Sequence, residues 1–373
     1  CLICKYKFMI LGVVLKNFLS FNNEVQFDMF PNMKRTSLSK HITMINEKLP
    51  VLKMAAVYGA NGAGKSNLLK GINFLKAIAL NKNFLDKESI TPSDEVNNMV
   101  LGWIEKNPFA SLLTINNDMP VLTDPNIGIA HKWFEDELTI IGLHSFNPAL
   151  IGIFKSNYEI NQFALELFRV IDLGIDEVKV ETENFEDWMS THDISNLPMD
   201  KLKEMRSGVL SEVVDFRNTR AISVEDGVQK ISQMMFRQFG ENGFSKEMDI
   251  QAQSDGTVRL LSLVPALYDA MKSGKTVVID ELDHSIHPHL VRELVRYFSV
   301  QDTNGQLIFT THQTCLLNQD FMRTDEVWMV EKNNGCSYMY SLNDFKIHNT
   351  INIENGYMEG RYGAIPFIGE LNM

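Results

Sequence analysis

"GANGAGKS", residues 59–66, is the strongest local signal in this sequence. It follows the apolar run Val51–Tyr58 and precedes a stretch of helical character at 67–80. It fits the pattern G-x-x-x-x-G-K-[ST], in which backbone N–H groups cradle phosphates, a Lys reaches the terminal phosphates and a Ser hydroxyl holds Mg²⁺. Because strand, loop and helix are the context that this pattern requires, the sequence predicts a phosphate-binding loop.

Around this loop, short apolar strands alternate with amphipathic helices, a pattern typical of a mostly parallel sheet covered on both faces. The sequence therefore predicts an α/β fold, with two further strands in an antiparallel arrangement at the start. We expect strands at 10–15, 25–30, 53–58, 276–279, 306–309, 326–330 and 337–342, and helices at 67–80, 256–271 and 288–299.

A long insertion interrupts this α/β pattern. We expect residues 1–84 and 246–373 to form the two halves of one domain, and residues 85–245 to form a largely helical insertion that acts as a lid or binds a partner. Apolar residues at helical spacing favour two helices there, and core packing explains their stripes better than a partner groove does. The two stripes are Ile160, Phe163, Ala164, Leu167, Phe168 and Ile171, and Val228, Ile231, Met235 and Phe239.

Composition sets further limits. The 373 residues carry a formal net charge of −12, from 35 Lys+Arg and 47 Asp+Glu, which argues against coating nucleic acid by bulk charge alone. The clearest apolar run, Phe8–Leu15, is about eight residues long, far below the ~20 that span a bilayer. We find no secretory signal and expect a cytoplasmic protein without a membrane partner. Cys1, Cys4, Cys315 and Cys336 form no disulfide framework, and the first two make at most half a zinc site.

An acidic strand end accompanies the phosphate loop. "TVVIDELD", residues 276–283, is a β-branched strand that ends in Asp280 and Glu281. At the carboxyl end of a parallel strand beside a phosphate loop, Asp280 can hold Mg²⁺ through water, and Glu281 can polarise the water that attacks a γ-phosphate.

Two more segments point to the same chemistry. In "QSDGTVRLL", residues 253–261, Ser254 or Asp255 caps a helix whose first turn contains Gly256, which leaves its backbone open for close approach. Such a helix N-terminus is an anion site, although a well-capped surface helix also explains it. "LIFTTHQ" ends a strand at His312, where a side chain can reach the γ-phosphate.

Together these motifs resemble the ABC-class ATPases found in SMC, RecF and OLD proteins. More narrowly, the chain resembles the compact AAA-type ATPases of prokaryotic anti-phage modules, including Septu, retron-associated and PARIS-type systems. The resemblance covers roughly the first 80 and the last 130 residues and implies an ABC-type ATPase domain that binds two ATP molecules in a head-to-tail dimer. It is carried by "NFLSF", "GANGAGKSNLLK", "WFEDEL", "SDGTVRLLSL", "IDELDHSIHPHL", "QLIFTTHQTCLL" and "GRYGAIPF".

The resemblance also implies a role for each matching residue. Glu281 is the general base, His312 the switch histidine, and Lys65 the lysine that contacts the phosphates. Ser66 and Asp280 are the Mg²⁺ ligands. The nucleotide contacts are Gly59, Asn61, Gly62, Ala63, Gly64, Lys65, Ser66 and Asn67 in one copy, with Ser254, Gly256 and Asp283 reaching the nucleotide of the other copy. Two features depart from the family: the glutamine that couples nucleotide state to the inserted domain cannot be placed, and residues 91–130 do not align.

These features lead to a hypothesis of function. We expect a regulatory ATPase, with ATP and Mg²⁺ as cofactors, that dimerises around ATP and controls a separate effector such as a nuclease or toxin in an anti-phage system. Higher oligomers and nucleic acid stay open as partners. The alternative is a DNA-repair or chromosome-maintenance clamp, like RecF or SMC, that binds DNA directly.

Other readings are less well supported. A ring-forming AAA+ remodeller would use Thr310 or Thr311 as a sensor and Arg361 as a finger, but the "SDGT" helix and His312 argue against it. In "NKNF", residues 81–84, Phe occupies the place of the acid that a GTPase needs. The histidines of "HSIHPH", residues 284–289, invite a metal interpretation, whereas Pro suits the start of a helix there.

Overall fold

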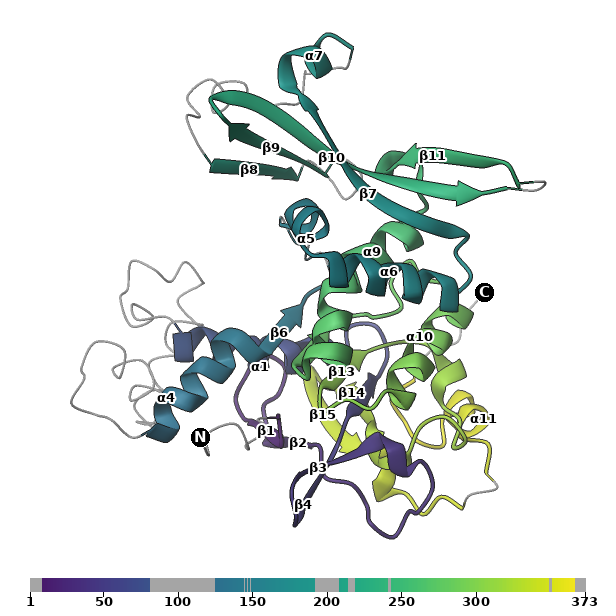
Figure 1. Ribbon diagram of the computed structural model, residues 1–373. Helices are drawn as coiled ribbons and strands as arrows, with labels where there is room; N and C mark the ends of the chain where they lie inside the picture. Colours follow the sequence, from purple (N-terminus) through teal and green to yellow (C-terminus); the bar gives the residue numbers. More distant parts are fainter. Residues whose placement is uncertain are drawn as a thin grey trace, which may run out of the picture. The chain divides into compact units, whose positions relative to one another are not determined.

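The computed structural model describes residues 9–80, 125–143, 145, 147, 149–191, 208–213, 219–240, 243–348 and 351–365 (Figure 1). The chain divides into two compact units. Unit 1 comprises Cys1–Leu143, Asp269–Asp283 and Arg296–Met373, and unit 2 comprises His144–Tyr268 and His284–Val295. These limits differ from the sequence-based division, which placed residues 85–245 alone in the insertion.

The core of unit 1 is a mostly parallel sheet, as the sequence predicts. In the described part of the chain, six strands form it in the order β15-β14-β5-β13-β12-β6. Each neighbouring pair is parallel except β14 and β15, which form an antiparallel hairpin at one edge. Three central strands are buried along their whole length, which explains their continuous apolar sequences. The strands are β5 (Met54–Tyr58), β6 (Leu138–Ile141), β12 (Thr276–Ile279), β13 (Gln306–Thr310), β14 (Val327–Asn333) and β15 (Cys336–Ser341).

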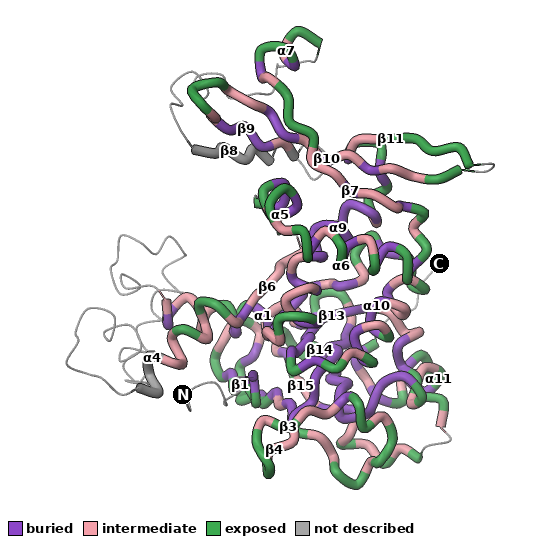
Figure 2. Tube along the Cα trace, in the orientation of Figure 1, coloured by how far each residue is buried: buried purple, intermediate pink, exposed green. Residues whose placement is uncertain are grey.

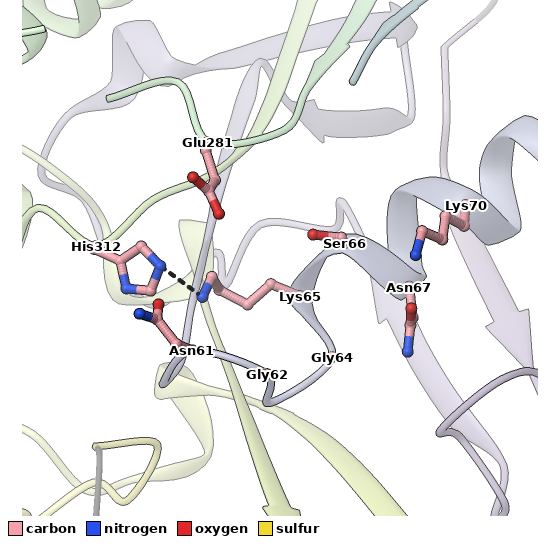
Figure 3. Close-up of a pocket in the computed structure, with 9 residues that line it drawn as sticks. All are labelled: Asn61, Gly62, Gly64, Lys65, Ser66, Asn67, Lys70, Glu281 and His312. Carbon is pink, nitrogen blue, oxygen red and sulfur yellow. Dashed lines mark hydrogen bonds between the residues drawn. The ribbon is translucent and has the colours of Figure 1, made fainter. Parts of the chain in front are cut away.

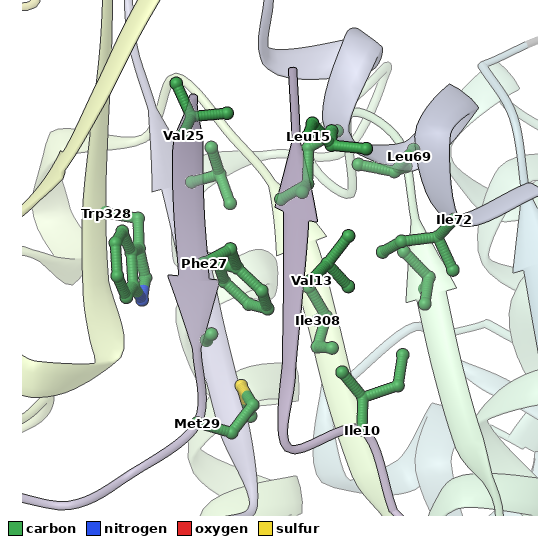
Figure 4. Close-up of a cluster of buried hydrophobic side chains, with 14 of the residues drawn as sticks. Ile10, Val13, Leu15, Val25, Phe27, Met29, Leu69, Ile72, Ile308 and Trp328 are labelled. Carbon is green, nitrogen blue, oxygen red and sulfur yellow. The ribbon is translucent and has the colours of Figure 1, made fainter. Parts of the chain in front are cut away.

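Helix α1 (Lys65–Leu80) follows β5 directly after the phosphate loop and packs with the N-terminal strands. These are β1 (Gly12–Leu15) and β2 (Val25–Asp28), an antiparallel pair as expected, followed by the hairpin of β3 (Ile42–Asn46) and β4 (Leu49–Leu52). Side chains of β1, β2 and α1 share one hydrophobic cluster with the sheet (Figure 4). The rings of Phe27 on β2 and Trp328 on β14 lie 5.1 Å apart in this cluster. Leu68, Leu69 and Ile72 of α1 belong to the same cluster, which therefore holds α1, and with it the phosphate loop, on the sheet.

The remaining helices of unit 1 are short. Helix α4 (Pro125–Lys132) and the π-helical turn Trp133–Glu137 precede β6, while α11 (Ile353–Met358) lies near the C-terminus. Helix α10 (Pro288–Val300) begins at the proline, as the sequence predicts; its residues 288–295 belong to unit 2 and only the remainder to unit 1. Among the described residues, no helix has both the length and the apolar character needed to cross a membrane.

Unit 2 combines helices with an antiparallel sheet. Helices α5 (Leu150–Ser156) and α6 (Tyr158–Val170) come first, and α6 matches the predicted stripe, with Ile160, Phe163 and Leu167 buried. The sheet contains β7 (Ile175–Asn184), β8 (Gly208–Val213), β9 (Thr219–Glu225), β10 (Val228–Phe239) and β11 (Ser245–Asp249), in the order β11-β10-β9-β8 with β7 also paired to β10. Helix α7 (Phe185–Met189) follows β7, and α9 (Asp255–Tyr268) follows β11.

The prediction of a largely helical insertion is wrong for this sheet. The stripe of Val228, Ile231, Met235 and Phe239 lies on a strand, β10, and Val228 and Phe239 are exposed. Ile231 of the stripe is buried, but so are Ser232, Met234 and Phe236, whose spacing is the period of a strand. Figure 2 shows buried, intermediate and exposed parts along β10. Tertiary pairing on both edges of β10 outweighs the helical spacing of its apolar residues.

A second part of the expected insertion also differs. Strand β6 pairs in parallel with β12, so residues 138–141 complete the core sheet of unit 1. Conversely, α9 groups with unit 2, although the sequence placed it in the C-terminal half of the ATPase domain. Residues 85–124, the polar start of the expected insertion, lie outside the described residues.

Candidate functional site

The predicted phosphate loop borders a cavity of about 720 Å³ in unit 1 (Figure 3). Residues from the β5–α1 loop, from the end of β12 and from the end of β13 meet there, because neighbouring parallel strands end at the same edge of the sheet. The lining residues are Asn61, Gly62, Gly64, Lys65, Ser66, Asn67, Lys70, Glu281 and His312.

Two glycines of the loop are required by close packing behind it. A Cβ atom on Gly59 would lie 2.3 Å from the carbonyl oxygen of Val330, and one on Gly64 would lie 2.4 Å from Ser337 Oγ. Gly64 also has a φ of +111°, which side chains rarely permit. The loop can therefore follow this path only with glycine at both positions, as the phosphate-loop pattern demands.

Lys65 projects from the first turn of α1 back over its own loop. Its Nζ donates to the carbonyl oxygens of Gly59 at 2.9 Å and Ala60 at 3.3 Å, and lies 3.0 Å from His312 Nε2. Burial lowers the pKa of Lys65, while the carboxylates of Glu281, Asp280 and Asp283 oppose that shift. The ammonium is thus held at the cavity wall, where loop and carboxylates meet.

Asp280 and Glu281 are tied together by a residue that the sequence analysis considered only as a sensor. Thr310, at the end of β13, is fully buried; its Oγ1 donates to Asp280 Oδ1 at 2.7 Å and accepts from the Glu281 backbone N–H at 2.7 Å. Ser66 Oγ donates to the same Asp280 oxygen at 3.1 Å. Glu281 has a φ of +47°, an uncommon conformation for glutamate, and its carboxylate points toward Lys65 (Figure 3). Such strain is a frequent feature of functional sites.

His312 follows β13, and its imidazole and the Glu281 carboxylate both lie near the Lys65 ammonium (Figure 3). Its backbone N–H donates to Asp283 Oδ2 at 3.2 Å, so Asp283 fixes the loop rather than lining the cavity. Burial, and then the positive charge of Lys65, lowers the pKa of His312. A neutral imidazole is therefore favoured at neutral pH, and its Nε2 can accept a hydrogen bond from the Lys65 ammonium.

Two serines that the sequence analysis did not single out support the phosphate loop from behind. Ser337 Oγ donates to the Ala63 carbonyl oxygen and lies 2.6 Å from Ser20 Oγ, which in turn accepts from Asn67 Nδ2 at 2.6 Å. Ser20 belongs to "NFLSF", so this motif supports the phosphate loop through hydrogen bonds. The sequence predicted only that the motif forms a turn. Its contacts could not be predicted, because Asn67 and Ser337 are far from Ser20 along the chain.

Lys70 is a further residue of the cavity that the sequence analysis did not assign. It lies on α1 after Lys65 and Ser66, and its exposed side chain lines the same cavity. It adds a second cation to a site that is otherwise lined by polar and glycine residues. The spacing along the helix places it there, but nothing in the loop pattern marks it.

Ser254 and Gly256 lie in unit 2, at the N-terminus of α9. Ser254 is exposed, and its Oγ accepts from the Thr257 backbone N–H at 3.1 Å, which makes it the helix cap. A Cβ on Gly256 would lie 2.7 Å from the carbonyl oxygen of Ser285. The absence of a side chain at Gly256 therefore makes room for the backbone of Ser285. Within one chain, both residues have a structural role.

Several other candidates fall outside the cavity. Arg361 forms an exposed ion pair with Glu359, with Nη2 2.6 Å from Oε2. In the part of the chain that the structure describes, no group of three or more His, Cys, Asp or Glu side chains is arranged to hold a metal, and Cys315 and Cys336 form no disulfide. Cys1 and Cys4 lie outside the described residues. The segment between β6 and α5, residues 142–149, contains no glutamine, so the coupling glutamine has no counterpart there.

Comparison with known proteins adds one sequence match. Residues 149–318 match a family model described as an AAA domain, putative AbiEii toxin of a type IV toxin–antitoxin system. This match covers less than half of the chain; it includes Asp280, Glu281 and His312 and leaves out the phosphate loop. No curated protein matches the chain.

Solved structures of SMC head domains are also similar. An SMC head bound to the C-terminal winged-helix domain of ScpA has 16% sequence identity and a TM-score of 0.46, covering 89% of this chain and 97% of that chain. The SMC head domain from Thermotoga maritima has 14% identity and a TM-score of 0.37, with 90% and 99% covered. A Pyrococcus furiosus SMC head bound to the C-terminal domain of ScpA has 15% identity and a TM-score of 0.39, with 94% and 98% covered. At these values the similarity does not bear on the function of this chain.

Proposed function

We propose that this chain is an ATPase of the ABC and AAA type, which binds ATP in the cavity at the phosphate loop. One observation carries the proposal: Lys65, Glu281 and His312 converge on a single cavity, although His312 lies 247 residues beyond Lys65. A cation, a carboxylate and a neutral imidazole around a glycine-rich loop are the groups that phosphoryl transfer from a nucleotide to water requires. The AAA-domain match supports the same class.

The residues beside the loop fit Mg²⁺. Ser66 Oγ and Asp280 Oδ1 lie 3.1 Å apart, and both are hard oxygen ligands of the kind Mg²⁺ prefers. Magnesium usually takes one or two protein ligands and completes its shell with water and substrate phosphates, so two protein oxygens suffice. When bound, Mg²⁺ would neutralise charge on the β- and γ-phosphates.

The chain's own residues then have separate roles. Lys65 exchanges its bonds to the loop carbonyls for bonds to the phosphates. Glu281 accepts a proton from the attacking water, since it lines the cavity and its carboxylate points toward Lys65 (Figure 3). His312, neutral because its pKa is lowered, can donate a hydrogen bond from its ring N–H to the terminal phosphate. Asp280 and Thr310 hold Glu281 in position.

The direct test is ATP turnover by purified chain. Lys65→Ala should lower turnover on the order of 10²- to 10³-fold, because one preorganised charge at the developing transition state is removed. Lys48→Ala is the matched control, since Lys48 is an exposed lysine in the β3–β4 turn of the same unit. Equal turnover by both variants would show that the cavity is not the hydrolytic site.

The same proposal includes a head-to-tail homodimer, in which Ser254, Gly256 and Asp283 of one copy act at the ATP held by Lys65 of another. The exposed position of Ser254 at a helix N-terminus supports it, because such a position is accessible to a second copy. We place the chain in the cytoplasm. Sedimentation with and without ATP tests the dimer: a monomer at all ATP concentrations would contradict it.

We further propose that the ATPase controls a separate effector, such as a nuclease or toxin, in an anti-phage system. The matched family's description names a toxin–antitoxin system, which supports a defence setting. Among the described residues, no group of three or more His, Cys, Asp or Glu side chains is arranged to hold a metal for a second reaction. Robust nuclease activity of the purified chain alone would contradict this division of labour.

The alternative is a clamp that binds DNA directly. The basic residues Lys155, Lys179, Lys230 and Arg237 of unit 2 are all engaged by carboxylates, so they do not form a free basic strip. Binding of duplex DNA at physiological salt by the chain alone would favour the clamp.

A further inference from the structure

The C-terminal motif "GRYGAIPF" has no place in the ATP site, yet its residue Tyr362 is hydrogen-bonded to the core sheet of unit 1. We call residues 352–364 the C-terminal cap; it comprises α11 and the turn that follows. Asn352 caps α11 by accepting from the Asn355 N–H, and the Arg361 N–H donates back to the Gly356 carbonyl oxygen at 2.9 Å. The cap is therefore a folded element.

The cap is anchored to the β14–β15 hairpin. Tyr340 Oη of β15 donates to the carbonyl oxygen of Tyr362 at 2.8 Å. A Cβ on Gly363 would lie 2.4 Å from Tyr340 Oη and 2.6 Å from Glu331 Oε2, and Gly363 has a φ of +66°. Only glycine fits there. Within the cap, Tyr357 Oη donates to the Ala364 carbonyl oxygen at 3.1 Å, which fixes α11 to the anchored turn.

The other side of the cap contacts the loop that carries His312. Thr314 Oγ1 donates to Glu354 Oε1 of α11 at 2.7 Å. Tyr58, fully buried at the end of β5, donates from Oη to the Gln313 carbonyl oxygen at 3.0 Å, and its ring packs edge-on against Tyr357 at 6.0 Å. The two residues directly after His312 are thus held by the cap and by a tyrosine that the cap covers.

Further hydrogen bonds hold this loop on its other side. Asp283 Oδ2 accepts from the His312 N–H at 3.2 Å and from Gln313 Nε2 at 3.3 Å, and Thr311 Oγ1 accepts from the Gln313 N–H at 3.0 Å. The loop is therefore attached both to Asp283 and to the cap. Since the imidazole lies 3.0 Å from Lys65 Nζ, a small displacement of the loop moves it out of hydrogen-bonding range.

We propose that the C-terminal cap positions His312: the Thr314–Glu354 hydrogen bond sets where the imidazole stands at the ATP site. This inference rests on the proposed ATPase function and deepens it, because it makes the C-terminus a point from which hydrolysis is controlled without contact with the nucleotide. Thr314 and Glu354 are positioning residues, and "GRYGAIPF" is the anchor that makes their contact firm.

The test compares two substitutions at Thr314. Thr314→Val keeps the shape and removes the donor, whereas Thr314→Ser keeps the hydroxyl. We expect Thr314→Val to lower kcat for ATP roughly tenfold, because misplacement of a catalytic group weakens the chemical step more than binding. The Kd for ATP, measured by titration, should change less than about twofold, since the phosphate loop is untouched. Glu354→Gln, which keeps an acceptor oxygen, should retain turnover that Glu354→Ala loses.

A double-mutant cycle separates this role from a merely structural one. In a His312→Ala background, Thr314→Val should lower kcat no further, because its effect is exerted through His312. A further loss of similar size there, or wild-type kcat for Thr314→Val alone, would overturn the proposal.

Hydrogen–deuterium exchange gives a readout that does not depend on turnover. Thr314→Val should accelerate exchange in residues 312–316 while leaving residues 59–66 unchanged. If the wild-type chain shows no ATP turnover, the proposed function fails, and this measurement still decides the inference. Unchanged exchange in residues 312–316 would overturn it.

Discussion

The N-termini of α1 and α9 are both polar helix starts with a serine and a nearby glycine, but their polar groups are used differently. At α1, Ser66 Oγ reaches Asp280, 214 residues away, and Lys65 reaches His312, 247 residues away. At α9, Ser254 Oγ reaches only Thr257, three residues away, and is otherwise exposed. The first helix start is therefore part of a site that one chain assembles, and the second is a capped helix.

This difference separates the two halves of the proposed mechanism. ATP binding and the hydrolytic groups rest on contacts within unit 1 of a single chain. The action of Ser254 requires a second copy, because within the described residues its hydroxyl bonds only to Thr257, at its own helix start. The dimer can therefore fail as a proposal while the ATP site stands, and experiments on the two helix starts should give distinguishable results.

The largest effect is expected at Glu281. Glu281→Gln removes the proton acceptor and should lower ATP turnover by roughly 10²- to 10⁴-fold while ATP binding persists. It should also prolong the ATP-bound dimer, measurable by light scattering during gel filtration. Glu47→Gln, at an exposed position in the β3–β4 turn, is the control. Turnover equal to that of the wild type would remove Glu281 from its role and leave the α1 site without a base.

Ser254→Asn tests the other side of the comparison. Asparagine caps helices about as well as serine, and Asn157, Asn184 and Asn352 cap helices in this chain, so stability should be nearly unchanged. If Ser254 contacts the ATP of a second copy, the longer side chain should lower turnover roughly tenfold, the value of one lost hydrogen bond. The reverse swap at α6, Asn157→Ser, is the control. Unchanged turnover in Ser254→Asn would reduce Ser254 to a cap.

Two fully buried threonines of unit 1 show how much the internal network of the site matters. Thr310 Oγ1 makes two hydrogen bonds, to Asp280 and to the Glu281 N–H, whereas Thr324 Oγ1 has no hydrogen-bond partner in the described structure. Thr310→Val should destabilise the fold by about 1–3 kcal/mol, because it leaves buried polar groups unsatisfied. Thr324→Val should be within about 0.5 kcal/mol of neutral. Chemical denaturation compares them, and equal effects would mean that the network contributes little.

The α1 site was readable from the sequence because its residues lie at the ends of strongly apolar strands. Val277, Val278 and Ile279 run directly into Asp280, and such continuous apolar runs are typical of strands in a buried parallel sheet. The end of each strand therefore predicts a position in space. The sequence did not predict that Thr310 connects Asp280 and Glu281. These contacts depend on the strand register between β12 and β13, which no local pattern specifies.

Unit 2 was harder to predict because its strands are amphipathic and marked mainly by their turns. The apolar residues of β10 fit a helical spacing, and the sequence-based prediction therefore favoured a helix over the hairpin that the residues before β10 indicate. Asp226–Gly227 lies between two alternating segments, and both residues have positive φ, +54° and +77°, as a two-residue hairpin turn requires. This Asp–Gly dipeptide is the local sequence signal that predicts the pairing of β9 with β10. The pairing of β7 with β10 across about 50 residues had no local signal.

The smallest effect is expected on the sheet of unit 2, where the contacts are local and exposed. Glu225 Oε2 lies 3.0 Å from Lys230 Nζ, and Oε1 lies 3.2 Å from Lys155 Nζ. Hydrogen bonds from these two lysines lower the pKa of Glu225 from 4.5 to about 2. A lowered carboxyl pKa stabilises the fold above the unfolded value, and this contribution is lost as the pH falls from about 4.5 toward 2.

Glu225→Gln should therefore be slightly less stable than the wild type at pH 7, and the difference should shrink as the pH falls through this window. Exposed ion pairs contribute little, so the effect should be smaller than that of Thr310→Val and should fade in high salt. Urea denaturation at pH 7, 4 and 3 measures it, with Glu47→Gln as the control. A difference that grows at low pH would contradict the assigned pKa shift. A difference as large as that of Thr310→Val would mean that the surface of unit 2 is as tightly coupled as the site of unit 1.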